Sequence, residues 1–335
     1  MRIVQSALLR AWYRGAWWLW LLRPLEALFR CVAALRRGLY QQGVLASYRA
    51  DRPVIVVGNI TLGGTGKTPV VIALVEALQG QGIRPGVVSR GYGASVGEYP
   101  HIVSDTSTVA ECGDETLLIY RRTGCPCVAA PSRPDAVRTL LANHAIDVVL
   151  SDDGLQHYAL RRDMEIVVVD AQAGYGNGFC LPAGPLREPV SRLRSVDFLL
   201  SRGSDDPASG VRYELDCLVN LATGEERAAS PEAIGNAAYA VAGIGQPKQF
   251  FQTLSELGFQ LEQRVFADHH AYRQEDFADL RDKPILMTEK DAIKCREFAG
   301  DNAWYLRINA RLPQALPQAV AALARSGTHA AWSGA

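Results

Sequence analysis

The sequence lacks an excess of charge of either sign, and it lacks a long apolar run. Thirty-five basic and 35 acidic side chains in 335 residues give a net charge near zero, so the composition gives no reason to expect nucleic acid as a partner. The apolar residues 16–22 are bracketed by Arg14 and Arg23. Because a spanning helix needs roughly 20 apolar residues in a row, this run is too short to predict one.

The cysteines lack a framework as well. Seven of them are scattered along the chain, and this odd number indicates a reducing cytoplasm without a set of disulfides. Cys125 and Cys127 form the one close pair, and no second pair or histidine spacing completes a zinc site. We interpret the pair as two small residues near the start of a strand, with metal binding as the less favoured alternative.

The N-terminus holds a cationic segment that is rich in tryptophan. Residues 1–50 contain eight arginines against a single acidic residue, Glu26. Tryptophans at headgroup level and arginines that reach anionic phosphates are typical of a helix in a membrane interface. A signal peptide fits less well, because the small-residue cleavage pattern is unconvincing, and a helix packed on the protein's own core is the other alternative. We predict that residues 1–40 form a basic amphipathic membrane-binding segment.

Beyond residue 52, short β-branched runs alternate with helical segments, which predicts an α/β fold with a mainly parallel sheet. A loop at residues 204–210 and a polar stretch at 222–237 indicate a domain boundary. We predict a larger domain over 41–210, a β-stranded linker over 211–235 and a smaller C-terminal α/β domain over 236–328. The predicted strands are 53–58, 86–89, 148–150, 166–169 and 198–200, and the predicted helices are 67–78, 113–122 and 134–143.

A glycine-rich sequence, Gly-Gly-Thr-Gly-Lys-Thr at 63–68, lies between a predicted strand and a predicted helix. Backbone N–H groups in such a turn cradle phosphate oxygens, and the helix N-terminus adds a favourable dipole. Lys67 is expected to neutralise the β and γ oxygens, and the Thr68 hydroxyl to reach Mg²⁺. The chain has Thr61 where the usual pattern has glycine, a modest departure because the strand–loop–helix context survives. The pattern predicts a P-loop nucleotide phosphotransferase that binds nucleotide through Thr61, Leu62, Gly63, Gly64, Thr65, Gly66, Lys67 and Thr68.

Carboxylates occur at the end of one predicted strand and at the start of one predicted helix. Asp152 and Asp153 end the apolar strand 148–150, and the ends of sheet strands face the ligand crevice. A carboxylate there can hold Mg²⁺; a turn opened by aspartates is the alternative, but the P-loop upstream favours the metal role. Asp114 opens a helix, where an N-cap role and a catalytic role are equally open.

Three other motifs carry weaker signals. His269 lies in an Asp-His-His cluster that can assist a base or bind a metal, although a lone histidine is more often structural. Arg90 follows a predicted strand and either binds an anionic substrate or is an exposed loop residue. The Thr-Glu-Lys-Asp sequence at 288–291 is similar to the guanine-reading Asn-Lys-x-Asp pattern, but its order is wrong, so GTP is not supported.

A series of motifs, in order and over nearly the whole chain, resembles the tetraacyldisaccharide 4'-kinase (lipid A kinase) family. The matching sequences are Gly-Asn-Ile-Thr at 58–61, Gly-Gly-Thr-Gly-Lys-Thr-Pro at 63–69, Ser-Arg-Gly-Tyr-Gly at 89–93, Gly-Asp-Glu at 113–115, Asp-Asp-Gly-Leu-Gln-His at 152–157, Leu-Pro-Ala-Gly-Pro-Leu-Arg-Glu at 181–188, Gly-Ile-Gly at 243–245, Phe-Ala-Asp-His-His at 266–270 and Thr-Glu-Lys-Asp-Ala at 288–292. Thr61, unusual for a P-loop in general, agrees with this family.

The resemblance implies a peripheral or monotopic enzyme on the cytoplasmic face of a Gram-negative inner membrane, an anionic surface. It implies transfer of the ATP γ-phosphate, with Mg²⁺, to the 4'-hydroxyl of a tetraacylated glucosamine disaccharide 1-phosphate, which gives lipid IVA. The implied fold has two α/β/α domains around a cleft, joined by a β-stranded linker, and we expect a monomer. The alternative is a membrane-associated P-loop ATPase switch, but such proteins usually carry a second lysine where this chain has Thr61 and Leu62.

The resemblance also implies residue roles. Asp114 is the implied base, supported by His269, and Lys67 completes the catalytic candidates. Glu115 and an aspartate of the Asp152–Asp153 pair would help Thr68 to hold Mg²⁺. The residues implied to line the sugar-phosphate side are Arg90, Tyr92, Gln156 and His157.

Overall fold

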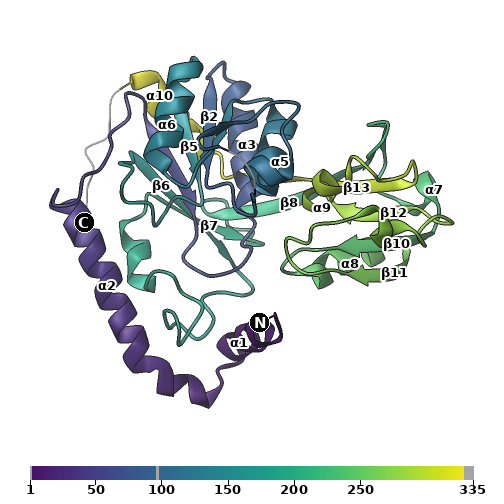
Figure 1. The fold of residues 1–335 in the computed structure, drawn as a ribbon, viewed down its shortest axis with the longest axis horizontal. Helices are drawn as coiled ribbons and strands as arrows, with labels where there is room; N and C mark the ends of the chain where they lie inside the picture. Colours follow the sequence, from purple (N-terminus) through teal and green to yellow (C-terminus); the bar gives the residue numbers. More distant parts are fainter. Residues whose placement is uncertain (1, 96–97, 328–335) are drawn as a thin grey trace.

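The structure is a computed structural model that describes residues 2–95 and 98–327. The predicted segment 1–40 begins at residue 1, and the predicted domain 236–328 ends at residue 328. Both of these residues lie outside the described residues. Figure 1 shows a larger α/β unit with a smaller unit beside it. Within the described residues, 13 strands from both units form one continuous sheet.

The larger unit is built on a mainly parallel sheet with the order β8-β7-β6-β1-β5-β2-β4-β3, in which β8 spans Gly210–Asn220. β1 pairs in parallel with β5 and β6, and the short β3 is antiparallel to β4. Long apolar runs form these strands because helices cover both faces of a parallel sheet. The strands are β1 (Val54–Gly58), β2 (Pro85–Ser89), β3 (His101–Ile102), β4 (Cys127–Ala129), β5 (Val148–Asp152), β6 (Met164–Asp170) and β7 (Phe198–Arg202).

Helices form the outer layers of the larger unit. On one face, α3 (Lys67–Gln79) and α5 (Asp114–Thr123) bury their apolar residues in a shared core, preceded by the short α4 (Val109–Cys112). On the other face, α6 (Arg133–Asn143) packs with a second cluster. The C-terminal α10 (Ala315–Ser326) also packs in the first core through Leu316 and Val320. The predicted smaller domain, 236–328, therefore includes a helix that lies on the larger unit.

The smaller unit has parallel strands in the order β11-β10-β12-β13. Apolar residues of α8 fill the core on one face of this sheet, and those of α9 join a cluster on the other face. The unit is thus a three-layer α/β/α sandwich. Its elements are α7 (Pro231–Ile234), β10 (Ala237–Ala242), α8 (Pro247–Glu256), β11 (Gln260–Val265), η3 (Gln274–Phe277), β12 (Ile285–Thr288), α9 (Glu289–Cys295) and β13 (Ala303–Arg311).

Two long strands connect the units. β8 (Gly210–Asn220) starts beside β7 in the larger unit and continues antiparallel to β13 in the smaller one, as Figure 1 shows. The short β9 (Glu226–Arg227) pairs with the end of β8. The connection is β-stranded, but one of its two strands, β13, lies far outside the range 211–235.

The strands and helices predicted between residues 53 and 200 coincide with β1, β2, β5, β6, β7, α3, α5 and α6 to within two residues at each end. η2 (Val190–Ser195) precedes β7. An α/β fold with a mainly parallel sheet is therefore confirmed.

The N-terminal segment folds as α1 (Arg2–Arg14), η1 (Trp17–Leu22) and α2 (Arg23–Gln41). Figure 1 shows α1 and α2 as two rods that meet at an angle along one side of the larger unit. Trp17 and Trp20 are 76% and 65% exposed, whereas Trp12 and Glu26 are buried. None of the described helices is both long and apolar enough to cross a membrane.

Candidate active site

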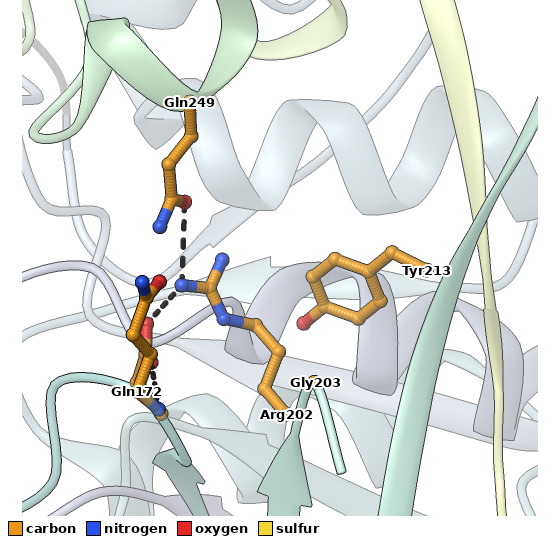
Figure 2. A pocket seen from close by; sticks show the side chains of 6 residues that line it. Gln172, Arg202, Gly203, Tyr213 and Gln249 are labelled. Carbon is orange, nitrogen blue, oxygen red and sulfur yellow. Dashed lines mark hydrogen bonds and ion pairs between the residues drawn. The ribbon is translucent and has the colours of Figure 1, made fainter. Parts of the chain in front are cut away.

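The phosphate loop joins β1 to α3. Gly66 caps α3 in the left-handed conformation, with φ of 81°, and a Cβ there would clash with the Tyr213 hydroxyl. That hydroxyl donates a hydrogen bond to the Gly66 carbonyl, and the Tyr213 ring lies beside Arg202 (Figure 2). The Leu62 amide donates to the Pro185 carbonyl at 2.8 Å. The loop is therefore held from both sides.

Lys67 and Thr68 are the first two residues of α3, as predicted. The Lys67 ammonium lies 3.5 Å from Oδ1 of Asp153, and Arg187 donates to both carboxylate oxygens of Asp153, at 3.1 and 2.9 Å. Burial alone would raise the pKa of Asp153, but the Lys67 and Arg187 cations hold it well below its ordinary value. Asp153 is therefore ionised and already paired with cations of this chain.

Asp152 has the opposite environment. It ends β5 and is 1% exposed, and burial, followed by the nearby negative charge of Glu115, raises its pKa to about 7. Its Oδ1 has no hydrogen-bond partner among the described residues. The buried guanidinium of Arg133 donates to the backbone oxygens of Ala130, at 3.1 Å, and of Asp152, at 2.8 Å. A buried carboxylate with a free oxygen, close to a second carboxylate, fits a divalent cation.

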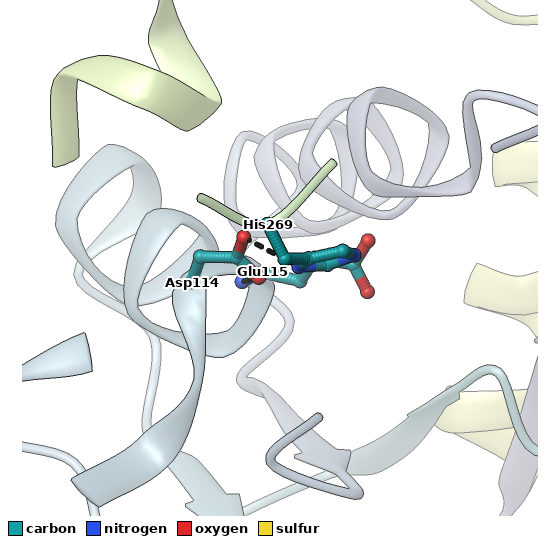
Figure 3. A group of neighbouring side chains, drawn as sticks. All are labelled: Asp114, Glu115 and His269. Atoms are coloured by element: carbon teal, nitrogen blue, oxygen red, sulfur yellow. Dashed lines mark hydrogen bonds and ion pairs between the residues drawn. The ribbon is translucent and has the colours of Figure 1, made fainter. Parts of the chain in front are cut away.

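Asp114 and His269 meet across the junction between the units (Figure 3). Asp114 is the first residue of α5 and is 2% exposed, and its Oδ2 lies 2.9 Å from Nδ1 of His269. His269 comes from the loop after β11 and has φ of 56°, a left-handed conformation that is uncommon for a residue with a side chain. The N-cap of α5 is Gly113, so the simple N-cap interpretation of Asp114 does not apply.

Two lysines of α9 surround this pair. The Lys290 ammonium lies 2.8 Å from Oε1 of Glu115, 3.4 Å from Nε2 of His269 and 3.8 Å from Oδ2 of Asp114. The Lys294 ammonium lies 3.9 Å from Oδ2 of Asp114. Burial would raise the pKa of Asp114, but the His269 hydrogen bond and these ammonium groups lower it. Asp114 is therefore ionised although it is buried.

Asp114, Glu115 and His269 can bring three ligand atoms within 4.8 Å of one another. The Lys290 ammonium already offsets the charge of this group, and its own pKa is raised, because the Glu115 and Asp114 carboxylates outweigh the effect of burial. We therefore interpret Asp114 and His269 as a hydrogen-bonded acid–base pair. The negative charge of Glu115 also raises the pKa of Asp152, so Glu115 links this pair electrostatically to the end of β5.

The four expected substrate-side residues occupy two places. Arg90 and Tyr92 follow β2, and the 62% exposed Tyr92 ring packs edge-on against His269 with centroids 5.0 Å apart. Gln156 and His157 lie in the turn after β5, where the Gln156 carbonyl accepts from Arg36 of α2 at 3.3 Å. Burial and the positive charges of Arg133 and Arg90 lower the pKa of His157 to about 4, so it is neutral. The structure thus brings Tyr92 to the acid–base pair and Gln156 to the N-terminal helices.

Several residues that contact the site were not predicted as site residues from the sequence. Arg187 lies in the motif at 181–188 and donates to the Asn59 side chain as well as to Asp153. Lys290 lies in the motif at 288–292, whose similarity to a guanine-binding pattern led only to a negative conclusion. Both residues lie in motifs that resemble the lipid A kinase family, and this resemblance was the sequence signal that could have identified them. Arg133 and Tyr213 lie outside those motifs, and no sequence signal pointed to them.

The comparisons with known proteins agree over nearly the whole chain. A family model described as tetraacyldisaccharide-1-P 4'-kinase (LpxK) matches residues 18–325. A tetraacyldisaccharide 4'-kinase from Azotobacter vinelandii is 52% identical over 306 residues, covering 90% of this chain and 92% of that protein. One from Pseudomonas aeruginosa is 50% identical with the same coverage. The chain belongs to the tetraacyldisaccharide-1-phosphate 4'-kinase family.

A solved structure supports the same assignment. The crystal structure of an "apo" form of LpxK from Aquifex aeolicus in complex with ATP has a TM-score of 0.76 and 27% identity, and covers 92% of this chain and 99% of its own. The protein described here is therefore an ATP-dependent kinase of this family. The comparisons do not favour the alternative of a membrane-associated ATPase switch.

Proposed function

We propose that this protein transfers the γ-phosphate of ATP to the 4'-hydroxyl of a tetraacylated glucosamine disaccharide 1-phosphate, giving lipid IVA in lipid A biosynthesis. The observation that carries the proposal is the 2.9 Å contact between Asp114 and His269, set beside a P-loop whose Lys67 lies 3.5 Å from Asp153. A phosphate-binding loop alone fits a switch as well as a kinase. A buried, ionised carboxylate paired with a histidine gives the site a base for an acceptor hydroxyl.

In the proposed mechanism, Asp114 accepts the proton of the 4'-hydroxyl as the hydroxyl oxygen attacks the γ-phosphorus. The bond between the γ-phosphorus and the β,γ-bridging oxygen breaks, and ADP leaves. His269 orients the Asp114 carboxylate through Nδ1, and Lys290 and Lys294 keep it ionised. Lys67 neutralises the β and γ oxygens of the donor. Phosphoryl transfer requires little covalent chemistry from the protein, so positioning and charge stabilisation supply most of the catalysis.

Mg²⁺ would be held by the Thr68 hydroxyl and by carboxylates of Glu115 and Asp152. The unpartnered Oδ1 of Asp152 and the charge interaction between Asp152 and Glu115 support this assignment. Asp153 is also a candidate, although Lys67 and Arg187 contact its carboxylate. Bound there, Mg²⁺ would neutralise charge on the β and γ phosphate oxygens.

The acceptor is a lipid, so the site has to reach a membrane. Each CH₂ group that leaves the bilayer costs about 0.8 kcal/mol, and an enzyme that acts on the headgroup is therefore expected to dock on the surface. Exposed Trp17, Trp20 and Leu21 support docking through η1. Arg36 links α2 to Gln156, beside the proposed sugar-phosphate site of Arg90, Tyr92, Gln156 and His157. We propose a monomer bound to the cytoplasmic face of the inner membrane.

The test is transfer of labelled γ-phosphate from ATP to a tetraacyl disaccharide 1-phosphate in mixed micelles containing Mg²⁺. Wild type is expected to label the lipid and Lys67→Ala to lose the labelling. Lys283→Ala is the matched control, because Lys283 pairs with Glu262 at the surface of the smaller unit, and it should retain activity. Magnesium-dependent ATP binding without any labelled lipid would disprove the proposed acceptor.

A further inference from the structure

Arg122 connects elements of both units at the junction between them. It lies in the last turn of α5, and its guanidinium donates to both carboxylate oxygens of Glu289 of α9, at 2.9 Å each, and to Oδ1 of Asn309 of β13, at 2.8 Å. The same guanidinium lies 3.5 Å from Oε1 of Glu76 of α3, the helix that follows the phosphate loop. One side chain thus joins two helices of the larger unit to a helix and a strand of the smaller unit.

The contact between Arg122 and Glu289 is shielded from water. Their side chains are 12% and 11% exposed, and burial raises the pKa of Glu289 although the Arg122 cation opposes this shift. Removing one member of such a pair is unfavourable, because the other charge stays buried without a partner. A solvated arginine at a helix C-terminus would only offset the helix dipole, whereas this guanidinium is turned into the other unit.

Glu289 is followed directly by Lys290 in the first turn of α9. Lys290 contacts Glu115 at 2.8 Å, at the opposite end of α5 from Arg122. Figure 1 shows α5 and α9 at the junction between the units, and the two helices pack against each other. The rise of α5 between Glu115 and Arg122 is about 10 Å. The start of α9 is therefore attached to α5 at two separate points, which fixes its direction as well as its position.

The direction of α9 determines where its ammonium groups lie. Lys290 and Lys294 are 3.8 and 3.9 Å from Oδ2 of Asp114, and the Lys290 ammonium is 3.4 Å from Nε2 of His269. Because the interaction between charges weakens with distance, a tilt of α9 on α5 would change the stabilisation of the Asp114 carboxylate. It would move both ammonium groups together.

We propose that Arg122 is a positioning residue for phosphoryl transfer. Through Glu289 and Asn309 it holds α9 on α5, and α9 then places Lys290 and Lys294 around the Asp114–His269 pair. The inference rests on the proposed function, in which that pair deprotonates the acceptor. Arg122 touches neither member of the pair in these contacts, so it acts on the pair through α9.

The first measurement is kcat for transfer of the γ-phosphate to a tetraacyl disaccharide 1-phosphate in mixed micelles. Arg122→Met is expected to lower kcat by roughly tenfold, and Arg122→Lys, which keeps a cation beside Glu289, by less than about threefold. Arg138→Met is the matched control, because Arg138 is an exposed arginine of α6 that pairs with Asp135 at 2.6 Å. It should have the kcat of wild type.

A double-mutant cycle separates positioning from a general loss of folded protein. In a Lys290→Met background, Arg122→Met should lower kcat by less than about threefold further, because the ammonium group that Arg122 places is already absent. A purely structural role would lower kcat by the same factor in both backgrounds. That result would overturn the proposal.

Hydrogen exchange on the full chain, in detergent micelles without acceptor, tests the attachment of α9 independently of the acceptor. Arg122→Met should speed exchange in α9, whereas β10, at the centre of the smaller unit, should keep its protection. Unchanged exchange in α9 would overturn the proposal. If wild type labelled no lipid, the proposed acceptor would be wrong, and the exchange in α9 would still decide whether Arg122 holds this helix.

Discussion

Nδ1 of His269 lies 2.9 Å from Oδ2 of Asp114, although the two residues are 155 positions apart and belong to different units. The acid–base pair is therefore a property of the junction between the units. Lys290 and Glu115 make a second contact across this junction, at 2.8 Å, and Arg122 and Glu289 make a third, at 2.9 Å. Any motion that separates the units breaks the Asp114–His269 contact together with these ion pairs.

Replacing Asp114 by asparagine is expected to lower kcat by roughly 10²- to 10⁴-fold, the usual contribution of a general base. The KM for ATP should change little, because the proposed role of Asp114 concerns the acceptor hydroxyl and not the nucleotide. Steady-state kinetics in mixed micelles measures both constants. His269→Gln should cause a smaller loss, whereas His270→Gln, next along the chain and paired with Asp276 at 3.1 Å, serves as the control. Near-normal turnover of Asp114→Asn would show that another group accepts the proton.

Lys290→Met is expected to shift the acidic limb of the pH–rate profile to higher pH. The Lys290 ammonium is one of the charges that lower the pKa of Asp114, so its removal raises this pKa and Asp114 becomes protonated at a higher pH. Activity lost at low pH should return at higher pH, and Lys290→Arg should behave more like wild type. The profile of kcat from pH 5 to 9 measures the shift. A uniform loss of activity at every pH would instead assign Lys290 to holding the two units together.

The sequence predicted local structure well because each strand and helix here follows from a local pattern. Val54–Gly58 is uniformly apolar and buried, and the glycines and Lys67 behind it can be placed without knowing the rest of the fold. A local pattern does not identify the surface against which an apolar face packs. α10 shows an amphipathic pattern, but that pattern does not say that Leu316 packs against the larger unit.

Individual site residues could be predicted from the sequence, but the contacts between them depend on tertiary packing. Asp114 and His269 were both candidates, yet their pairing depends on how α5 packs against the smaller unit. Lys290 was not predicted because its three partners, Asp114 and Glu115 of α5 and His269 of the loop after β11, come together with α9 only in the folded protein. Tyr213 reaches Gly66 from 147 positions away, and a lone tyrosine in a predicted linker carries no signal for such a contact.

Stability is expected to fall as the pH is lowered from about 6.5 to about 4, in part because of His157. Its pKa in the folded protein is about 4, below the ordinary value of about 6.5, so the unfolded chain binds more protons in this window. The linked loss is about 3 kcal/mol at most. Urea unfolding of wild type and His157→Gln at pH 7 and pH 4.5 measures it. The variant should lose less stability than wild type, and equal losses would mean that His157 is not the group responsible.

The N-terminal helices are expected to depend on Glu26 for their attachment. This glutamate is 2% exposed, accepts a hydrogen bond from the Cys180 amide at 3.2 Å and lies 3.2 Å from Arg23. Glu26→Leu leaves that buried amide without its partner, which costs about 1–3 kcal/mol. Hydrogen exchange should then show faster opening of α1 and α2, while the core strands of the larger unit keep their protection.

Glu256→Leu is the control for this prediction, because Glu256 is an exposed residue of α8 in the smaller unit. If the proposed docking is correct, Glu26→Leu should also lower phosphate transfer to a lipid in micelles more than it lowers ATP binding. The reason is that Glu26 connects the docking helices to Cys180. Arg187, which pairs with Asp153 at the site, lies a few residues after Cys180 on the same segment. Unchanged exchange in α1 and α2 would mean that Trp12, which donates to the Pro182 carbonyl at 3.1 Å, holds the helices without Glu26.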